Sequence, residues 1–409
     1  MSEQTNSSTG SSSPPDSSAD SPASEIPGRE ALLAAACEQA GLDDFGELWF
    51  GEHIDRLVDA LNTESRLSAA GAMGAQGMIV NAMVNRLRHV ELVKNNPQIC
   101  DIAVNVAAIV VGLPRTGSTM MHRMLAAAPG MTGVKWYEAQ NYAPFPGEQR
   151  GDPSPRRAAA EGILGYMLEQ IPELMSIHPM SIDQPDEEVI ILGQLFSSTM
   201  IESTYYVPGY TKWLVQQDRV QAYRDLKQIL QALVWQLPER EGAAWVLKTP
   251  GHLMALDAAM SVFPDAKIVM THRDPVSTVP SYCSMEDTLY RMGSADISHQ
   301  MIGDYWFDRL HDLVSSFMDV RAAAEGNADE SKFVDIRYPD LLANPVAEGE
   351  RVLQAIGIGV DDEIRASMQE WIEANKREDR APHKYDLSDF GLTKDSIQEK
   401  FAAYTKRFL

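Results

Sequence analysis

Cysteine, basic side chains and long apolar runs are scarce in this sequence of 409 residues. Its three cysteines, Cys37, Cys100 and Cys283, lie far apart and are odd in number, which supports neither a disulfide framework nor a zinc site. They fit a reducing compartment, the cytoplasm. The longest apolar run, around residues 106–112, is far shorter than the roughly 20 residues of a membrane-spanning helix. We therefore expect a soluble protein without a membrane span.

Positive charge is the second shortage. Lys and Arg total 35 against 58 Asp and Glu, which gives a formal net charge of −23. A surface this acidic repels phosphate backbones and anionic headgroups. The composition therefore argues against general nucleic-acid binding.

The chain divides into three parts by composition. Residues 1–28 are rich in Ser, Pro and Asp, cannot bury enough apolar surface to fold, and predict a disordered tail. Residues 29–100 have helical periodicity and predict an N-terminal helical region. Residues 101–409 predict one α/β domain, in which a helical cap occupies about residues 144–240.

Strand patterns alternate with helical ones in the predicted α/β domain. A continuous β-branched apolar segment at 104–111 is typical of a strand buried on both faces, and residues 132–138 read as the next strand. Further strands are predicted at 244–248, 267–271 and 332–336. This alternation favours a parallel sheet with helices on both faces.

The first strand leads directly into a glycine-rich turn, residues 112–119, with the sequence GLPRTGST. A turn between a buried strand and a helix exposes backbone N–H groups and the positive end of a helix dipole, which suit a phosphate. Ser118 occupies the place of the lysine in the triphosphate-binding pattern GxxxxGK[ST], while Arg115 supplies a cation at the crest of the turn. The alternative is that the glycines only permit a tight turn.

A second candidate phosphate contact follows the strand at 267–271. Arg273 lies just beyond the carboxyl end of that strand, where open α/β sheets bind ligands, and its planar guanidinium suits a phosphate monoester. Ser281 lies about two turns into the following helix and is placed to reach back toward it. Alternatively, Arg273 pairs with Asp274 and Ser281 is a surface hydroxyl.

These two patterns resemble the sulfotransferases that use 3′-phosphoadenosine 5′-phosphosulfate (PAPS), above all their bacterial branch, and the likeness implies a P-loop-type fold. The resemblance implies PAPS as co-substrate and no metal. It also assigns cofactor-binding roles to the turn, to the arginine–serine pair, to a tyrosine near the adenine and to two C-terminal cations: Arg115, Thr116, Gly117, Ser118, Thr119, Arg273, Ser281, Tyr338, Arg380 and Lys384.

Sulfuryl transfer to a hydroxyl needs a base and cations that meet the developing charge. Glu138, expected at the end of the second strand, faces the same sheet edge as Arg115 and is one candidate base; relatives carry a glutamate in a similar place. Its alternative is an ion pair with a neighbouring helix. His252 is the competing base, although it follows Lys248 by four residues where cytosolic relatives have two. Lys248, at a strand end, is the electrostatic partner, and Arg115 completes the predicted catalytic set.

The sequence as a whole predicts a PAPS-dependent sulfotransferase. Methionines and aromatic side chains in the cap favour a small, hydrophobic hydroxyl acceptor. The histidines show no metal-ligand spacing. Two other functions stay open: a P-loop kinase or NTPase, which requires Mg²⁺, and a non-catalytic nucleotide-binding protein of the same fold.

Overall fold

A five-stranded parallel sheet forms the centre of the computed structural model, which describes residues 25–172, 174–177, 179–376 and 386–409. The strand order is β2-β3-β1-β4-β5. Every pair of neighbouring strands is parallel. The strands are β1 (Asn105–Gly112), β2 (Met131–Thr132), β3 (Ala244–Lys248), β4 (Lys267–His272) and β5 (Phe333–Arg337). The prediction of a parallel sheet is confirmed, and four of its strands lie within one residue of the predicted bounds.

The predicted second strand is wrong in its extent. Only Met131–Thr132 pairs with β3, and the chain then forms helix α5 (Trp136–Gln140). The Glu138 carboxylate accepts a 2.8 Å hydrogen bond from the backbone N–H of Lys135, three residues earlier, which caps the first turn of this helix. Residues 136–138, which were predicted to continue the strand, therefore belong to a helix and do not pair with β3.

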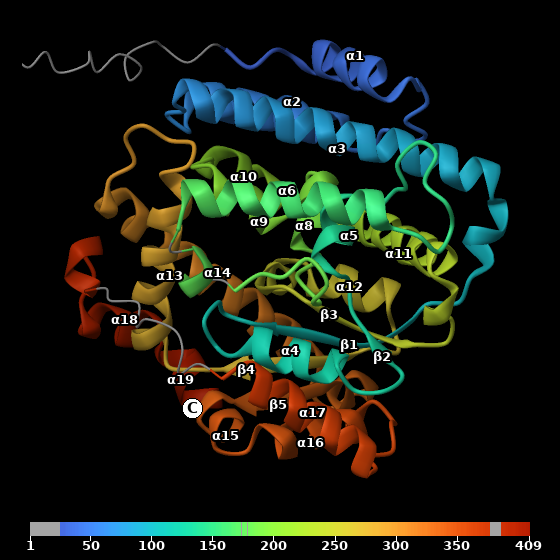
Figure 1. Cartoon of the computed structure of the whole chain (residues 1–409). Helices are drawn as coiled ribbons and strands as arrows, with labels where there is room; N and C mark the ends of the chain where they lie inside the picture. The colour runs from blue at the N-terminus through green and yellow to red at the C-terminus, as the bar shows by residue number, and fades with distance from the viewer. Residues whose placement is uncertain (1–24, 173, 178, 377–385) are drawn as a thin grey trace, which may run out of the picture.

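Side chains of β1 alternate between two helical layers, as a strand buried on both faces requires. Ala108 and Val110 pack toward α4 and the helices that follow β5, whereas Ile109 and Val111 pack toward α11–α14. Figure 1 shows these two layers on opposite sides of the strands. The first layer contains α4 (Ser118–Ala126), α15 (Tyr338–Ala343), α16 (Pro345–Ala355) and α17 (Asp362–Ala374). The second contains α11 (Val220–Gln236), α12 (Leu256–Val262), α13 (Pro275–Tyr290) and α14 (His299–Ala324).

Helices also fill the N-terminal region and the cap, as predicted, although the division into domains stays a prediction. Leu57, Ile79 and Met83 of the N-terminal helices share one apolar core with Phe196 and Ile201 of the cap. The N-terminal helices are α1 (Arg29–Ala40), α2 (Gly51–Thr63) and α3 (Ala69–Asn95). The cap helices before α11 are α6 (Ser154–Gln170), α7 (Leu174–Ile177), α8 (Val189–Gln194), α9 (Thr199–Thr204) and α10 (Pro208–Leu214).

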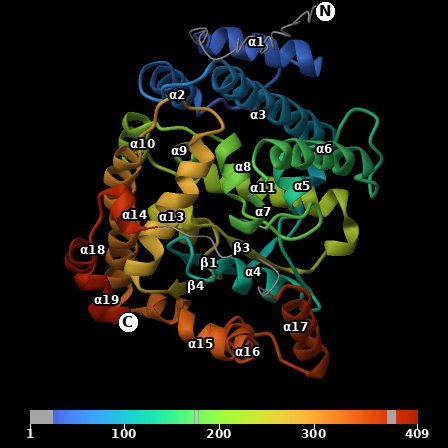
Figure 2. The same cartoon turned by 60° about the vertical axis from the view of Figure 1, so that its left-hand side comes forward.

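The chain ends in two short helices, α18 (Lys394–Lys400) and α19 (Ala402–Phe408), which pack beside α13 and α14 (Figure 2). Short 3₁₀ helices connect several elements: Pro97–Asp101, Pro238–Arg240, Pro250–Met254, Ala328–Lys332 and Leu387–Phe390. Among the residues that the structure describes, no helix is both long and apolar enough to cross a membrane. Residues 1–24 of the predicted tail, and Arg380 and Lys384, lie outside the described residues.

Candidate active site

The turn between β1 and α4 has backbone conformations that residues other than glycine rarely adopt. The φ angles are 152° at Gly112, 70° at Arg115 and 89° at Gly117. A Cβ atom on Gly117 would lie 2.9 Å from the Leu341 side chain and 3.0 Å from the Tyr338 ring. Glycine is therefore required at 117 both by the backbone and by the close approach of α15. The turn brings the N-terminus of α4, with Ser118 and Thr119, to the carboxyl edge of the sheet. The positive end of a helix dipole favours an anion at such a place.

Thr116 stabilises the turn from within. Its buried hydroxyl contacts the Leu113 carbonyl and the Thr271 hydroxyl, each at 2.6 Å. The side chain thus joins the turn to strand β4. Any contribution of Thr116 to a ligand comes through its backbone.

Arg115, Arg273 and Ser281 come together although they are far apart in the sequence. Arg273 Nη1 donates to the main-chain carbonyl of Arg115 at 2.8 Å, and Arg115 Nε donates to Ser281 Oγ at 3.3 Å. The Arg273 guanidinium also lies over the Tyr338 ring, 4.3 Å from its centroid. The predicted turn, arginine–serine pair and tyrosine therefore form one group.

Lys248 lies on the other side of β1, at the end of β3, and is 1% exposed. Its Nζ donates to the Thr119 hydroxyl at 2.9 Å and forms an ion pair with Glu187. Its backbone N–H donates to Glu188 at 3.0 Å. Lys248 is thus a buried cation directed at the first turn of α4, in contrast to a solvated lysine.

His252 lies in the 3₁₀ helix Pro250–Met254 and is fully enclosed. Its Nε2 contacts the Glu188 carboxylate, and its Nδ1 lies 2.7 Å from the Tyr223 hydroxyl. Burial alone would raise the pKa of Glu188, but His252 and the Lys248 N–H hold that pKa below its usual value. Glu188 is therefore an anion, held in place by His252.

Comparison with known proteins identifies the family to which this arrangement belongs. Residues 108–362, which contain the turn, Lys248 and Arg273, match the model of the sulfotransferase family. The chain belongs to this family. The sulfotransferase STF1 from Mycobacterium tuberculosis H37Rv superposes with a TM-score of 0.81 at 29% identity, covering 93% of this chain and 99% of that one. STF9 from Mycobacterium avium superposes with a TM-score of 0.82 at 23% identity over 95% of this chain and 98% of that one, which shows the same fold.

Two curated relatives are also similar to this chain. Both are named omega-hydroxy-beta-dihydromenaquinone-9 sulfotransferase Stf3, one from Mycobacterium bovis and one from Mycobacterium tuberculosis. Each is 28% identical over 260 residues, which is 61% of this chain. The match spans 62% of the length of each relative.

Glu138 of this family member does not end a strand, contrary to the prediction. It lies in α5, is 0% exposed and forms an ion pair with Arg240 at 2.9 Å. The Tyr137 hydroxyl also donates to it at 3.0 Å. These contacts match the alternative of an ion pair with a neighbouring helical segment. Its role as the base stays a prediction that none of these contacts supports.

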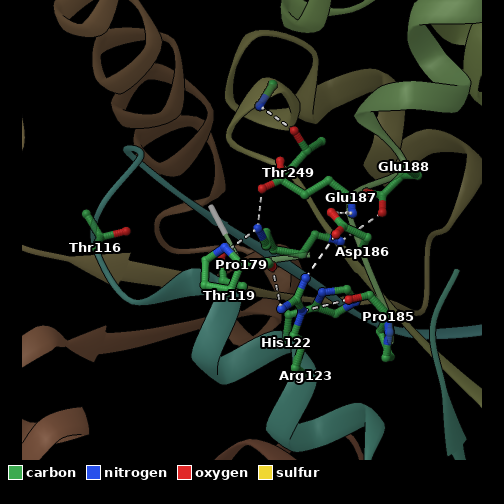
Figure 3. A network of polar contacts seen from close by, with 12 residues as sticks. Thr116, Thr119, His122, Arg123, Pro179, Pro185, Asp186, Glu187, Glu188 and Thr249 are labelled. Carbon is green, nitrogen blue, oxygen red and sulfur yellow. Dashed lines mark hydrogen bonds and ion pairs between the residues drawn. The ribbon is translucent and has the colours of Figure 1, made fainter. Parts of the chain in front are cut away.

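The acidic residues of the site were missed at the sequence level. Figure 3 shows Glu187 and Glu188, which directly precede α8, above Thr119 and Arg123 of α4. Arg123 is buried and pairs with Asp186 at 2.9 Å, and it also donates to the Pro185 carbonyl at 2.8 Å. These bonds fix the acidic segment on α4. The signal in the sequence is a run of three consecutive acidic residues in the cap, Asp186, Glu187 and Glu188.

Proposed function

We propose that this protein transfers a sulfuryl group from PAPS to a hydroxyl group of a small, hydrophobic acceptor. One observation carries the proposal: cations stand on both sides of the turn at the N-terminus of α4. Lys248 contacts Thr119 on the β3 side, and Arg273 contacts Arg115 on the β4 side. A nucleotide with an anionic group at each end fits this arrangement, because each end meets its own cation.

In this proposal the turn and Lys248 bind the 5′ end of the donor, and Arg273 with Ser281 binds the 3′-phosphate. The backbone of residues 116–119 and the hydroxyls of Ser118 and Thr119 bind the 5′-phosphosulfate beside the dipole of α4. Tyr338, which contacts both Gly117 and Arg273, supplies an aromatic face for the adenine. Arg380 and Lys384 remain proposed contacts to the 3′-phosphate.

We assign the base to Glu187 in preference to Glu138 and His252. The side chain of Glu187 is 15% exposed and lies against Lys248, whereas the side chain of Glu138 is 0% exposed and bonded to Arg240. His252 is enclosed between Glu188 and Tyr223. Glu187 is therefore the carboxylate that an acceptor hydroxyl at the α4 N-terminus reaches.

The proposed reaction balances with these residues. The acceptor oxygen forms a bond to sulfur, the bond from sulfur to the bridging oxygen of the 5′-phosphate breaks, and the electron pair of that bond leaves with 3′,5′-adenosine diphosphate. Glu187 takes the acceptor proton. Lys248 stabilises the charge that develops on the bridging oxygen, as donors placed at such an oxygen do in related transfers.

The acceptor class rests on the apolar cap and on the relatives. The Stf3 proteins are named for a menaquinone-derived hydroxyl acceptor, and we propose an apolar, long-chain alcohol or quinol for this protein too. We also place the protein in the reducing cytoplasm, because Cys37, Cys100 and Cys283 are all free thiols.

Transfer of radiolabelled sulfate from PAPS to a panel of alcohols tests the proposal. The panel contains polyprenyl alcohols, hydroxylated quinols, phenols and sugars, each assayed with and without EDTA. We expect transfer to the apolar alcohols and no turnover of ATP with Mg²⁺. Binding of 3′,5′-adenosine diphosphate without transfer to any acceptor would favour the non-catalytic alternative, and metal-dependent ATP hydrolysis would favour the kinase or NTPase.

A further inference from the structure

The C-terminal helix α19 packs against the end of β4, the strand that leads to Arg273. The Tyr404 hydroxyl of this helix lies 3.0 Å from His272 Nδ1. His272 immediately precedes Arg273 in the chain. Tyr404 and His272 are both buried, at 1% and 0% exposure. The helix therefore meets the backbone that carries the proposed 3′-phosphate contact.

His272 is held from its other side as well. Its Nε2 lies 3.0 Å from an Asp335 oxygen, and the second Asp335 oxygen accepts from Arg321 at 3.2 Å. The Phe408 ring stacks on the imidazole at 4.5 Å between centroids, with 11° between the planes. With both nitrogens bonded and one face covered, the imidazole has a fixed orientation.

Tyr404 also acts on the backbone of Arg273. Burial raises the pKa of the Tyr404 phenol above its usual value, and the backbone amide of Arg273 opposes that shift. The phenol oxygen is therefore close to the peptide group of Arg273. Loss of this oxygen would release the end of β4 on the side facing α19.

The last residue of the chain contacts the neighbouring strand end. Arg337 Nη2 donates to the main-chain oxygen of Leu409 at 3.3 Å, and Arg337 directly precedes Tyr338. The C-terminal segment thus contacts His272, which precedes Arg273, and Arg337, which precedes Tyr338.

We propose that Tyr404 is a positioning residue that aligns Arg273, through His272 and the end of β4, for the 3′-phosphate of the nucleotide. The proposal rests on the proposed function, because it takes Arg273 as the 3′-phosphate contact. Tyr404 does not touch the ligand in this scheme. Its effect is confined to the part of the affinity that the 3′-phosphate contributes.

Tyr404→Phe in the full chain tests the proposal, since it removes only the hydroxyl. We expect the Kd for 3′,5′-adenosine diphosphate, measured by calorimetry, to rise about fivefold to tenfold, the effect of one buried hydrogen bond. The Kd for 5′-adenosine monophosphate should change by less than about twofold. The ratio of the two affinities is an internal control, because a reduced folded fraction affects both titrations alike.

Tyr210→Phe is the matched control. Tyr210 is 2% exposed, and its hydroxyl donates to the Phe196 carbonyl at 2.7 Å in the N-terminal core, so this variant also loses one buried hydrogen bond. The affinity ratio should not change in Tyr210→Phe. The double variant Arg273→Ala/Tyr404→Phe should have the same affinity ratio as Arg273→Ala alone, because Tyr404 acts through Arg273.

The outcomes separate this inference from the function on which it rests. If Arg273→Ala weakens 3′,5′-adenosine diphosphate but Tyr404→Phe leaves the affinity ratio unchanged, the positioning role is overturned and the nucleotide assignment stands. If Arg273→Ala itself leaves the ratio unchanged, the assignment of the 3′-phosphate site is wrong. An equal loss of affinity for both nucleotides in Tyr404→Phe would indicate a structural role only.

Discussion

Arg273 Nη1 donates a 2.8 Å hydrogen bond to the main-chain carbonyl of Arg115, 158 residues away in the sequence. The bond joins the crest of the glycine-rich turn to the end of β4. Arg115 returns a bond of its own to Ser281 in the helix that follows. The turn and the proposed 3′-phosphate contact thus form a single structural unit.

Replacement of Arg273 should weaken the binding of the doubly phosphorylated nucleotide. Arg273→Ala removes a charge-assisted contact and is expected to cost about 1.5–3 kcal/mol in the binding of 3′,5′-adenosine diphosphate. Arg273→Lys should recover only part of this affinity, because an ammonium cannot make the bidentate contact. Calorimetric titration measures both variants, and an affinity equal to wild type in Arg273→Ala would refute the assignment.

Replacement of Lys248 should slow the chemical step. Lys248→Ala removes the cation beside Thr119, and we expect kcat to fall about hundredfold, as for the loss of one preorganised donor. Lys94→Ala is the control: Lys94 also pairs with a carboxylate, that of Asp44, but in an exposed position in the N-terminal region. Steady-state assays with saturating PAPS should show kcat near wild type for Lys94→Ala. A similar kcat for both variants would contradict the proposed role of Lys248.

Replacement of the two candidate glutamates should have different consequences. Glu187→Gln is expected to bind nucleotide normally and to lose at least about a hundredfold in kcat, because no carboxylate then accepts the acceptor proton. Glu138→Gln leaves Arg240 buried without its counter-ion and should lower the free energy of unfolding by about 3 kcal/mol. Rate assays and urea denaturation distinguish the two. Full activity in Glu187→Gln, together with loss of turnover in a folded Glu138→Gln protein, would return the role to Glu138.

Glu286 should make the stability depend on pH. It lies in α13 with 0% exposure, and burial, aided by the charge of Glu202, raises its pKa well above the usual value, while the Tyr282 and Ser203 hydroxyls oppose the shift only in part. The folded state therefore holds a proton that the unfolded state releases above about pH 4.5. Its contribution to stability is complete below that pH and is lost as the pH rises toward the folded-state pKa.

Glu286→Gln isolates this effect, because the amide keeps the shape and cannot ionise. From pH 5 to pH 8, the free energy of unfolding of the wild type should fall relative to the variant by up to about 1.4 kcal/mol per pH unit. Urea denaturation at several pH values measures the difference. If the free energies of unfolding of the two proteins depend on pH in the same way, Glu286 does not release a proton on unfolding in this pH range, and the prediction is wrong.

Much of the sheet follows from local sequence, and the error at Glu138 shows where that reasoning ends. The strands β1, β3, β4 and β5 each contain a run of apolar residues, so their burial in the sheet is visible in the residues themselves. Residues 132–138 lack that property, and the start of α5 is bonded both to the Glu138 carboxylate and to the carbonyls of Ile182 and Gln184. Contacts with residues almost fifty positions away are not visible in periodicity.

The residues of the site also fall into those that the sequence could predict and those that it could not. Arg273 and Ser281 follow a recognisable strand, so their approach to the turn follows from topology. Glu187 reaches Lys248 because contacts such as the Arg123–Asp186 ion pair fix its segment on α4. That segment has no regular periodicity, and its place depends on contacts between residues about sixty positions apart. Long-range pairs of this kind leave no local pattern.

The order β3-β1-β4 also fixes the spacing between the strand that ends at Lys248 and the strand that leads to Arg273. Neighbouring strands stand about 4.8 Å apart, and Val110 of β1 is the register partner of both Lys248 and Val269, so the backbones at Lys248 and Val269 are about 10 Å apart. Arg273 lies four residues, roughly 13 Å, further along the direction of β4. Hydrogen bonds of the sheet hold the two strands in this register, whatever the flexibility of the side chains. In the proposed binding mode, a nucleotide is therefore selected by its length as well as by its charge, and a nucleotide with a single anionic group reaches only one of the two cations.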